Sequence, residues 1–164
     1  MSTIKGYIAA YIMKNKPLNT LPDLTLFASI IIALLLGKLF PDTQLSAATV
    51  SSVVGAVLIV GSLGLSMAIL AFMIRRGGST DVVKTSKLLI TDKYFRLSRN
   101  PLYLVELLFV VGVATFAGSP VSFIGPAIYF LVLNFVVIPH EERELEKVFG
   151  NKYLQYKQST RRWL

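Results

Sequence analysis

The sequence predicts an all-α integral membrane protein with four transmembrane helices, an amphipathic N-terminal interfacial helix and a helical C-terminal tail in the cytosol. Of its 164 residues, 54% are hydrophobic and only 16% are charged. A soluble domain of this size could not bury that much apolar surface. The apolar residues also fall in long blocks, as lipid contact requires, and not in short alternating runs.

Residues 1–16 carry an amphipathic pattern that predicts a helix lying in the plane of the membrane interface. Their lysines lie off a face on which apolar residues recur at spacings of three and four, namely Ile4, Tyr7, Ile8, Tyr11 and Ile12. A signal peptide is the alternative. It is disfavoured because the apolar stretch is short and runs into Lys14-Asn15-Lys16, where a cleavage site would need small residues.

Four apolar segments follow, and we expect each to cross the membrane: residues 24–40, 47–74, 101–116 and 121–138. The second is the longest and must tilt or project from the bilayer. Small residues along it would let a neighbouring helix approach closely, and we interpret them as packing positions: Ser52, Gly55, Ala56, Gly61, Gly64, Ala68 and Ala71. The turn at 117–120 is so short that the last two segments must form an antiparallel hairpin.

Basic residues set the predicted orientation. All lysines and arginines except Lys38 fall in the N-terminal segment, the loop 75–100 and the tail 140–164. The positive-inside rule places these three segments on the cytoplasmic side. We therefore expect residues 1–164 to form one multi-pass domain, in a prokaryotic inner membrane, with both termini and any active site facing the cytoplasm.

Composition excludes several kinds of site. With no cysteine and a single histidine, the chain cannot build a disulfide framework, a thiolate nucleophile or an all-histidine metal site, and we expect no bound metal. The formal charge of +8 is explained by topology and anionic lipid. We therefore expect the lipid bilayer as a partner and no nucleic acid, and the sequence leaves the oligomeric state open.

The start of the third span is a candidate anion site. Asn100 is a good N-cap and Pro101 suits the first helical position, so a plain helix start is one interpretation. The other is that the free N–H groups of Leu102 and Tyr103 hold a carboxylate with help from Arg99. Local spacing leaves both open.

Carboxyl groups near the membrane are the other candidates. Glu141 and Glu142 follow the fourth span closely, at a level where carboxylates are costly unless paired or used. They begin a helix with an apolar stripe that includes Leu145 and Phe149 and that should stop at Gly150. Glu106 lies inside the third span and is either functional or a snorkelling side chain paired with an arginine.

These motifs, in this order, resemble the isoprenylcysteine carboxyl methyltransferase and phospholipid methyltransferase superfamily. The resemblance covers roughly residue 75 to the C-terminus. It is carried by Gly78-Ser79-Thr80, Phe95-Arg96-Leu97-Ser98-Arg99-Asn100-Pro101-Leu102-Tyr103, Glu141-Glu142, Leu145, Phe149-Gly150, Tyr153, Tyr156 and Arg161-Arg162-Trp163.

The resemblance implies a methyltransferase that uses S-adenosylmethionine and a lipophilic acceptor, a carboxylate or an amine, entering from the bilayer. The implied cofactor-binding residues are Leu89, Phe95, Arg99, Asn100, Pro101, Leu102, Tyr103, Glu141 and Glu142. Glu141, as a base, and Arg162, as a docking cation, are the implied catalytic residues. The implied substrate-binding residues are Glu106, Tyr153, Tyr156 and Arg161.

Three departures from the family pattern bear on the substrate. Asn100 stands where histidine is frequent, Lys93-Tyr94 replaces a Gly-Pro-like pair, and Val137 stands where the eukaryotic prenylcysteine enzymes have an arginine. The last departure weakens a prenylcysteine carboxylate as the acceptor.

The sequence also bears on four other classes of protein. A membrane reductase that uses a nicotinamide cofactor and a non-catalytic structural membrane protein remain alternatives. A transporter is disfavoured because few strongly polar side chains lie inside the spans. A soluble-type methyltransferase is excluded because the chain has no glycine-rich strand-to-helix turn.

Overall fold

The computed structural model describes residues 2–40, 48–77 and 88–164, with side chains from residue 20 onward in the first range and from residue 49 in the second. The predicted turn at 41–46, the Gly78-Ser79-Thr80 motif and the apolar face of residues 1–16 lie outside these described parts. Within them every regular element is a helix, which confirms the all-α class.

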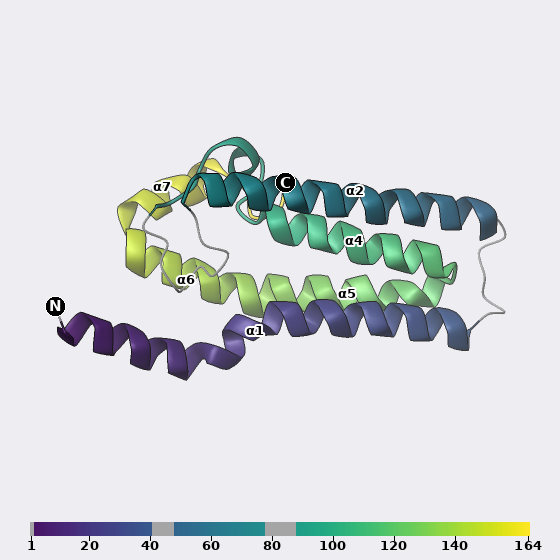
Figure 1. The fold of residues 1–164 in the computed structure, drawn as a ribbon, viewed down its shortest axis with the longest axis horizontal. Coiled ribbons are helices and arrows are strands. Elements are labelled where there is room, and N and C mark those ends of the chain that lie inside the picture. Colours follow the sequence, from purple (N-terminus) through teal and green to yellow (C-terminus); the bar gives the residue numbers. More distant parts are fainter. Residues whose placement is uncertain (1, 41–47, 78–87) are drawn as a thin grey trace.

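Four helices run side by side as the body of the molecule (Figure 1). They are α1 (Ser2–Leu39), α2 (Ala48–Arg75), α4 (Pro101–Ala117) and α5 (Ile124–Val132). The end of α2, the start of α4 and the helices after α5 gather at one end of this bundle (Figure 1). The remaining elements are η2 (Lys93–Arg96), η3 (Pro120–Phe123), the π-helix η4 (Leu133–Val137), α6 (Ile138–Phe149) and α7 (Asn151–Ser159).

The first helix is longer than its predicted span. We expected an interfacial helix over 1–16 and a span over 24–40, but helical backbone continues from Ser2 to Leu39 through Pro17 and Pro22. Figure 1 shows this helix bending between its N-terminal part and the part that joins the bundle. Proline bends a helix because its ring removes a backbone donor and crowds the preceding turn. The interfacial position of the N-terminal part stays a prediction.

Among the residues that the structure describes, three helices are long and apolar enough to cross a membrane: 20–39, 49–75 and 120–149. The predicted third span, Pro101–Ala117, is apolar but has only 17 residues. At 1.5 Å per residue it covers about 25 Å, somewhat less than a hydrocarbon core of about 30 Å. The structure therefore supports three spans by length and leaves the fourth as a prediction.

The fourth predicted span does not end at Ile138. Helical structure continues from η3 through α5, η4 and α6 as far as Phe149, so the charged residues from His140 onward extend the same rod. The predicted stop at Gly150 is confirmed, since this residue has a φ of +55° and separates α6 from α7. The glutamates of α6 thus lie on the same continuous helical backbone as the apolar residues that precede them.

Close packing of α2 on α4 depends on glycine. An added Cβ at Gly55 would lie 2.5 Å from the backbone nitrogen of Phe116, so only glycine permits this approach. The predicted packing role is wrong for Gly61 and Gly64, because no described atom lies within 4 Å of a Cβ added at either residue. One buried core cluster packs α4 against α5, η4 and the start of α6, and comprises Val110, Tyr129, Leu133, Val137 and Ile138. A second joins α4 to α1 and comprises Ala33, Val113 and Ala114.

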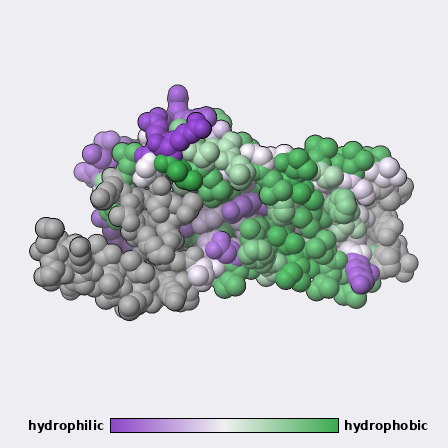
Figure 2. All heavy atoms as spheres, in the orientation of Figure 1, coloured by the Kyte–Doolittle hydropathy of each residue, from purple (hydrophilic) through white to green (hydrophobic). Residues whose placement is uncertain are grey.

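Large apolar side chains cover the outside of the bundle. Many are more than half exposed, including Phe27, Val57, Val60 and Met67. On the face that Figure 2 shows, hydrophobic residues cover most of the described bundle, whereas the largest group of hydrophilic residues lies at the end that carries α6 and α7. A contiguous apolar surface of this extent indicates contact with lipid.

Candidate active site

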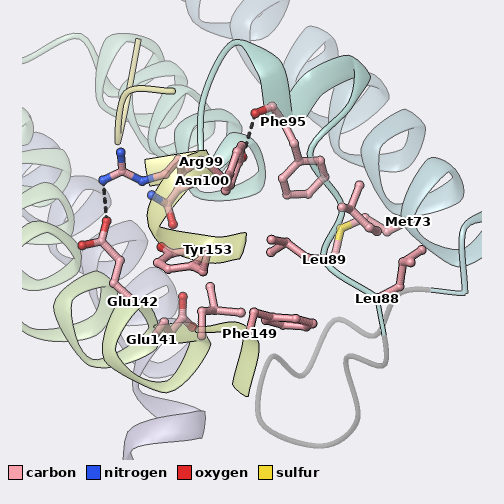
Figure 3. A pocket seen from close by; sticks show the side chains of 13 residues that line it. Met73, Leu88, Leu89, Phe95, Arg99, Asn100, Glu141, Glu142, Phe149 and Tyr153 are labelled. Carbon is pink, nitrogen blue, oxygen red and sulfur yellow. Dashed lines mark hydrogen bonds and ion pairs between the residues drawn. The ribbon is translucent and has the colours of Figure 1, made fainter. Parts of the chain in front are cut away.

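A cavity opens at the polar end of the bundle (Figure 3). It encloses about 670 Å³ of empty space, its open mouth included. Its walls come from the end of α2, the segment before α4, α6 and α7, so residues from distant parts of the chain share one space. The lining residues are Met73, Leu88, Leu89, Ile90, Phe95, Arg99, Asn100, Glu141, Glu142, Leu145, Phe149, Tyr153 and Tyr156.

A buried ion pair forms one side of the cavity. Arg99 Nη2 lies 2.7 Å from Glu142 Oε1, and the two side chains are only 9% and 6% exposed. Arg162 Nη2 and Lys157 Nζ approach the other carboxylate oxygen at 3.0 and 3.6 Å. Because a buried carboxylate is stable only when it is paired, these three cations fix Glu142 in its ionised form.

Arg99 also binds the backbone of the C-terminal segment. Its Nη1 donates to the carbonyl of Lys157 at 3.0 Å and to that of Thr160. Its Nε is buried and has no hydrogen-bond partner among the described residues. The guanidinium thus holds protein groups with both of its terminal nitrogens.

Glu141 is held differently from its neighbour. Tyr103 donates a hydrogen bond of 2.7 Å from its hydroxyl to Glu141 Oε1, and no cation is within ion-pair distance of Glu141 in the described structure. The two adjacent glutamates therefore differ in environment: one is neutralised by arginines, and the other faces the cavity with a tyrosine as its partner.

Asn100 stands at the N-cap of α4, as predicted, but its side chain makes no capping bond to the described first turn. Instead, its Nδ2 donates to the carbonyl of Arg162 at 3.0 Å. The N–H groups of Leu102 and Tyr103 consequently have no side-chain cap from Asn100. An uncapped helix start carries partial positive charge, which favours an anionic group.

The opposite wall is apolar and aromatic. Leu88, Leu89 and Phe149 lie there with Phe95 and Met73 (Figure 3). Tyr156 braces this wall, because its hydroxyl donates to the carbonyl of Phe95 at 2.7 Å. Burial raises the pKa of Tyr153 to about 12 and also raises the pKa of Tyr156, so both phenols stay neutral at neutral pH.

The structure brings together most of the residues proposed from sequence. Those that line the cavity are Leu89, Phe95, Arg99, Asn100, Glu141, Glu142, Tyr153 and Tyr156. Pro101, Leu102 and Tyr103 follow directly in α4 but are absent from the described lining, and Tyr103 reaches the site through Glu141. The side chain of Arg161 is at the surface, whereas that of Arg162 turns inward to Glu142.

Glu106 lies apart from the cavity. Tyr129, a fully buried residue of α5, donates a hydrogen bond of 2.6 Å to its carboxylate. The proposed snorkelling pair with an arginine is not found among the described contacts, where the partner is a tyrosine inside the bundle.

Sequence reasoning did not assign five lining residues: Met73, Leu88, Ile90, Leu145 and Phe149. The predicted apolar stripe of the tail helix already contained Leu145 and Phe149. That shared face was the signal that could have assigned both residues to the cavity. Met73 lies next to the end of the predicted second span, and nothing local distinguishes it from a lipid-facing residue. No group of three His, Asp or Glu residues suited to a metal occurs in the described ranges.

Comparisons with known proteins identify the family. The model of the phospholipid methyltransferase family matches residues 50–152. An uncharacterized protein of Haemophilus influenzae is 40% identical over 63 residues, which cover 38% of this chain and all of that protein. Protein-S-isoprenylcysteine O-methyltransferase A of Arabidopsis thaliana is 35% identical over 72 residues, 44% of this chain and 36% of the Arabidopsis protein.

No solved structure matches the chain. The family match includes the segment before α4 and the whole of α4 and α6, and every lining residue of the described cavity falls within it except Tyr153 and Tyr156. It confirms the resemblance seen in the sequence. The chain belongs to the phospholipid methyltransferase family of membrane methyltransferases.

Proposed function

We propose that this protein transfers a methyl group from S-adenosylmethionine to a lipophilic acceptor that enters from the bilayer. The observation that carries this proposal is the cavity itself, which has a charged side and an apolar side and opens where the apolar bundle ends. Membership of the methyltransferase family supports the reaction class, and the residues around the cavity support the cofactor.

The polar and apolar groups that line the cavity fit the two ends of the cofactor. Its amino-acid end carries a carboxylate and an ammonium group, for which the uncapped start of α4 and the Glu141 carboxylate offer partners, and the Arg99 guanidinium lines the same cavity. Its adenine needs a flat apolar surface, for which Phe95, Phe149 and Leu89 are suited. When bound, the cofactor supplies an electrophilic methyl group on a sulfonium.

The protein's own contribution is positioning and proton handling. Methyl transfer is an in-line displacement, and holding both reactants in line is worth about 7–11 kcal/mol. Glu141 can accept a proton from an amine acceptor, because it faces the cavity and no cation neutralises it in the described structure. Arg162 is already engaged by Glu142 and Asn134, which weakens its proposed role as a docking cation for a carboxylate acceptor.

The proposed setting is a prokaryotic inner membrane, with α4 as a fourth, short span and both termini in the cytoplasm. The bundle supports this arrangement, because the segment before α4, α6 and α7 share one end of the molecule. These segments hold most of the basic residues, and the positive-inside rule assigns that end to the cytoplasm.

Calorimetric titration of the purified, detergent-solubilised protein tests the cofactor. We expect S-adenosylhomocysteine to bind and a reduced nicotinamide dinucleotide not to bind. Phe149→Ser should weaken binding because Phe149 lines the cavity, whereas Val148→Ser, at a neighbouring residue that is 65% exposed, should not. Binding of the nicotinamide cofactor alone would favour the reductase alternative.

A further inference from the structure

Residues 160–163, which we call the C-terminal clasp, connect the segment that leads into α4 with the long helical rod 120–149. On one side they bind the segment that leads into α4. The backbone N–H of Arg99 donates to the carbonyl of Arg161 at 2.9 Å. Ser98 Oγ and Asn100 Nδ2 both donate to the carbonyl of Arg162, at 3.1 and 3.0 Å. Three consecutive residues before α4 are therefore fixed by two carbonyls of the clasp.

On its other side the clasp binds the long helical rod. Arg162 reaches Glu142 of α6 with Nη2, at 3.0 Å. Its Nη1 lies 3.3 Å from the carbonyl of Asn134. Trp163 donates from Nε1 to Asn134 Oδ1 at 3.0 Å, and its ring packs on Phe130 with the centroids 5.3 Å apart. The clasp thus ties the rod to the start of α4.

Asn134 is an unusual partner for such contacts. It lies in the five-residue π-helix Leu133–Val137, within an apolar stretch of the rod. A π-helix shifts the backbone bonding pattern, and short π segments occur frequently at functional sites. A polar side chain within an apolar helix is costly unless partnered, and Arg162 with Trp163 satisfies Asn134.

We propose that the clasp is a positioning element for the cofactor cavity. Arg162, Trp163 and Asn134 are positioning residues, and none of them lines the described cavity. Arg162 binds Glu142, which does line it, and Asn134 anchors both Arg162 and Trp163. The inference rests on the proposed function, since the cavity is the proposed cofactor site. It assigns a role to Asn134 and Trp163, to which neither the sequence nor the family match assigns one.

The first test needs no ligand. Trp163 is the single tryptophan of the chain, so its fluorescence reports on the clasp alone. Asn134→Leu should release the indole and increase its quenching by acrylamide, because the side-chain acceptor is lost. Phe135→Leu, at a neighbouring residue of the same π-helix that is 68% exposed, is the matched control. Equal quenching in both variants would show that Asn134 does not hold the clasp.

The second test measures the affinity for S-adenosylhomocysteine together with the melting temperature. Trp163→Phe keeps the ring packing but removes one donor, and we expect about a fivefold loss of affinity, as for one net hydrogen bond. Arg162→Gln should cost about tenfold or more, because it breaks a charged pair. Arg143→Gln, which removes an exposed arginine of the same helix as Glu142, is the control.

The double variant of Asn134 and Trp163 tests whether the two residues affect affinity through one shared bond. The Asn134→Leu and Trp163→Phe variants remove the same bond, so the double variant should lose little more affinity than either single variant. Undiminished affinity in the Trp163→Phe, Asn134→Leu and Arg162→Gln variants would overturn the positioning role and leave the proposed function standing. Failure of the unmodified protein to bind S-adenosylhomocysteine would overturn both.

Discussion

Tyr103 and Glu141 lie 38 residues apart in the sequence and are joined by a hydrogen bond of 2.7 Å between the first turn of α4 and the first turn of α6. The bond commits the Tyr103 hydroxyl to Glu141. Because it fixes one oxygen of Glu141, it also orients the carboxylate relative to the cavity.

Tyr103→Phe should therefore lower kcat more than it changes KM for the methyl donor. Loss of a hydrogen bond to a charged group costs about 1.5–3 kcal/mol, which corresponds to a reduction of roughly ten- to a hundredfold. Turnover with a radiolabelled methyl donor and a lipid extract measures the effect. Tyr94→Phe, whose ring packs on Phe72, is the control. A rise in KM alone would place Tyr103 among the binding residues.

Arg99→Ala should weaken S-adenosylhomocysteine binding by about 1.5–3 kcal/mol, through loss of a charged donor beside the cavity. It should also lower the melting temperature, because Glu142 is only 5% exposed and loses its shortest ion pair. Titration calorimetry and thermal unfolding in detergent separate the two effects. Arg96→Ala, at an exposed residue of η2, should change neither. A folded Arg99→Ala variant with normal affinity would remove Arg99 from the site.

Local patterns predicted the helix start at Asn100-Pro101 because cap preference and the fixed φ of proline act within one turn. They did not predict that the Asn100 side chain would donate to Arg162, 62 residues away, since that contact depends on the tertiary fold. For the same reason the sequence proposed both Arg161 and Arg162 for the site, without indicating which side chain would lie at the surface. The fold distinguishes them, because only Arg162 turns inward to Glu142.

Hydropathy likewise predicted that the helices exist but not how they pair. Gly55, Gly61 and Gly64 are alike in a run of apolar residues, yet only the backbone position of Gly55 faces Phe116. The π-helix at Leu133–Val137 leaves no compositional signal, because its residues suit an α-helix equally well.

Gly55→Ala should destabilise the protein, since the added methyl group would meet backbone and side-chain atoms of Phe116 within 2.7 Å. Overpacking of this kind costs about 1–3 kcal/mol. Gly61→Ala makes the same chemical change where no described atom lies within 4 Å, and it should be neutral or slightly stabilising. Thermal unfolding in one detergent compares the two. Equal melting temperatures would mean that α2 and α4 are not packed through Gly55.

Cysteine labelling tests the proposed topology, because the chain has no native cysteine. Ser119 is fully buried, so the exposed neighbour Pro120 is the better site on the predicted outer side. Lys152, exposed on α7, represents the predicted cytoplasmic side. In sealed right-side-out vesicles an impermeant maleimide should label the Pro120→Cys variant and spare the Lys152→Cys variant. The reverse pattern would invert the topology.

Glu141 should matter more to turnover than the other glutamates of α6. Glu144 pairs with exposed Lys147 at 2.8 Å, and Glu146 pairs with Lys157 at 2.7 Å, so both have cations that Glu141 lacks within the described structure. Glu141 also lines the cavity, where a proton leaving an amine acceptor would need a base.

Glu141→Gln keeps the size of the side chain and its bond from Tyr103 but removes the basic oxygen. We expect turnover to fall by about a hundredfold or more, as loss of general-base assistance does, while Glu144→Gln stays near the unmodified protein. Glu146→Gln should also be nearly silent, apart from any effect through Lys157, which lies 3.6 Å from Glu142. Methyl transfer to lipid extracts gives the rates, and S-adenosylhomocysteine titration shows whether binding survives. If Glu141→Gln and Glu144→Gln lose activity equally and slightly, then Glu141 carries no proton and its carboxylate serves only to pair with Tyr103.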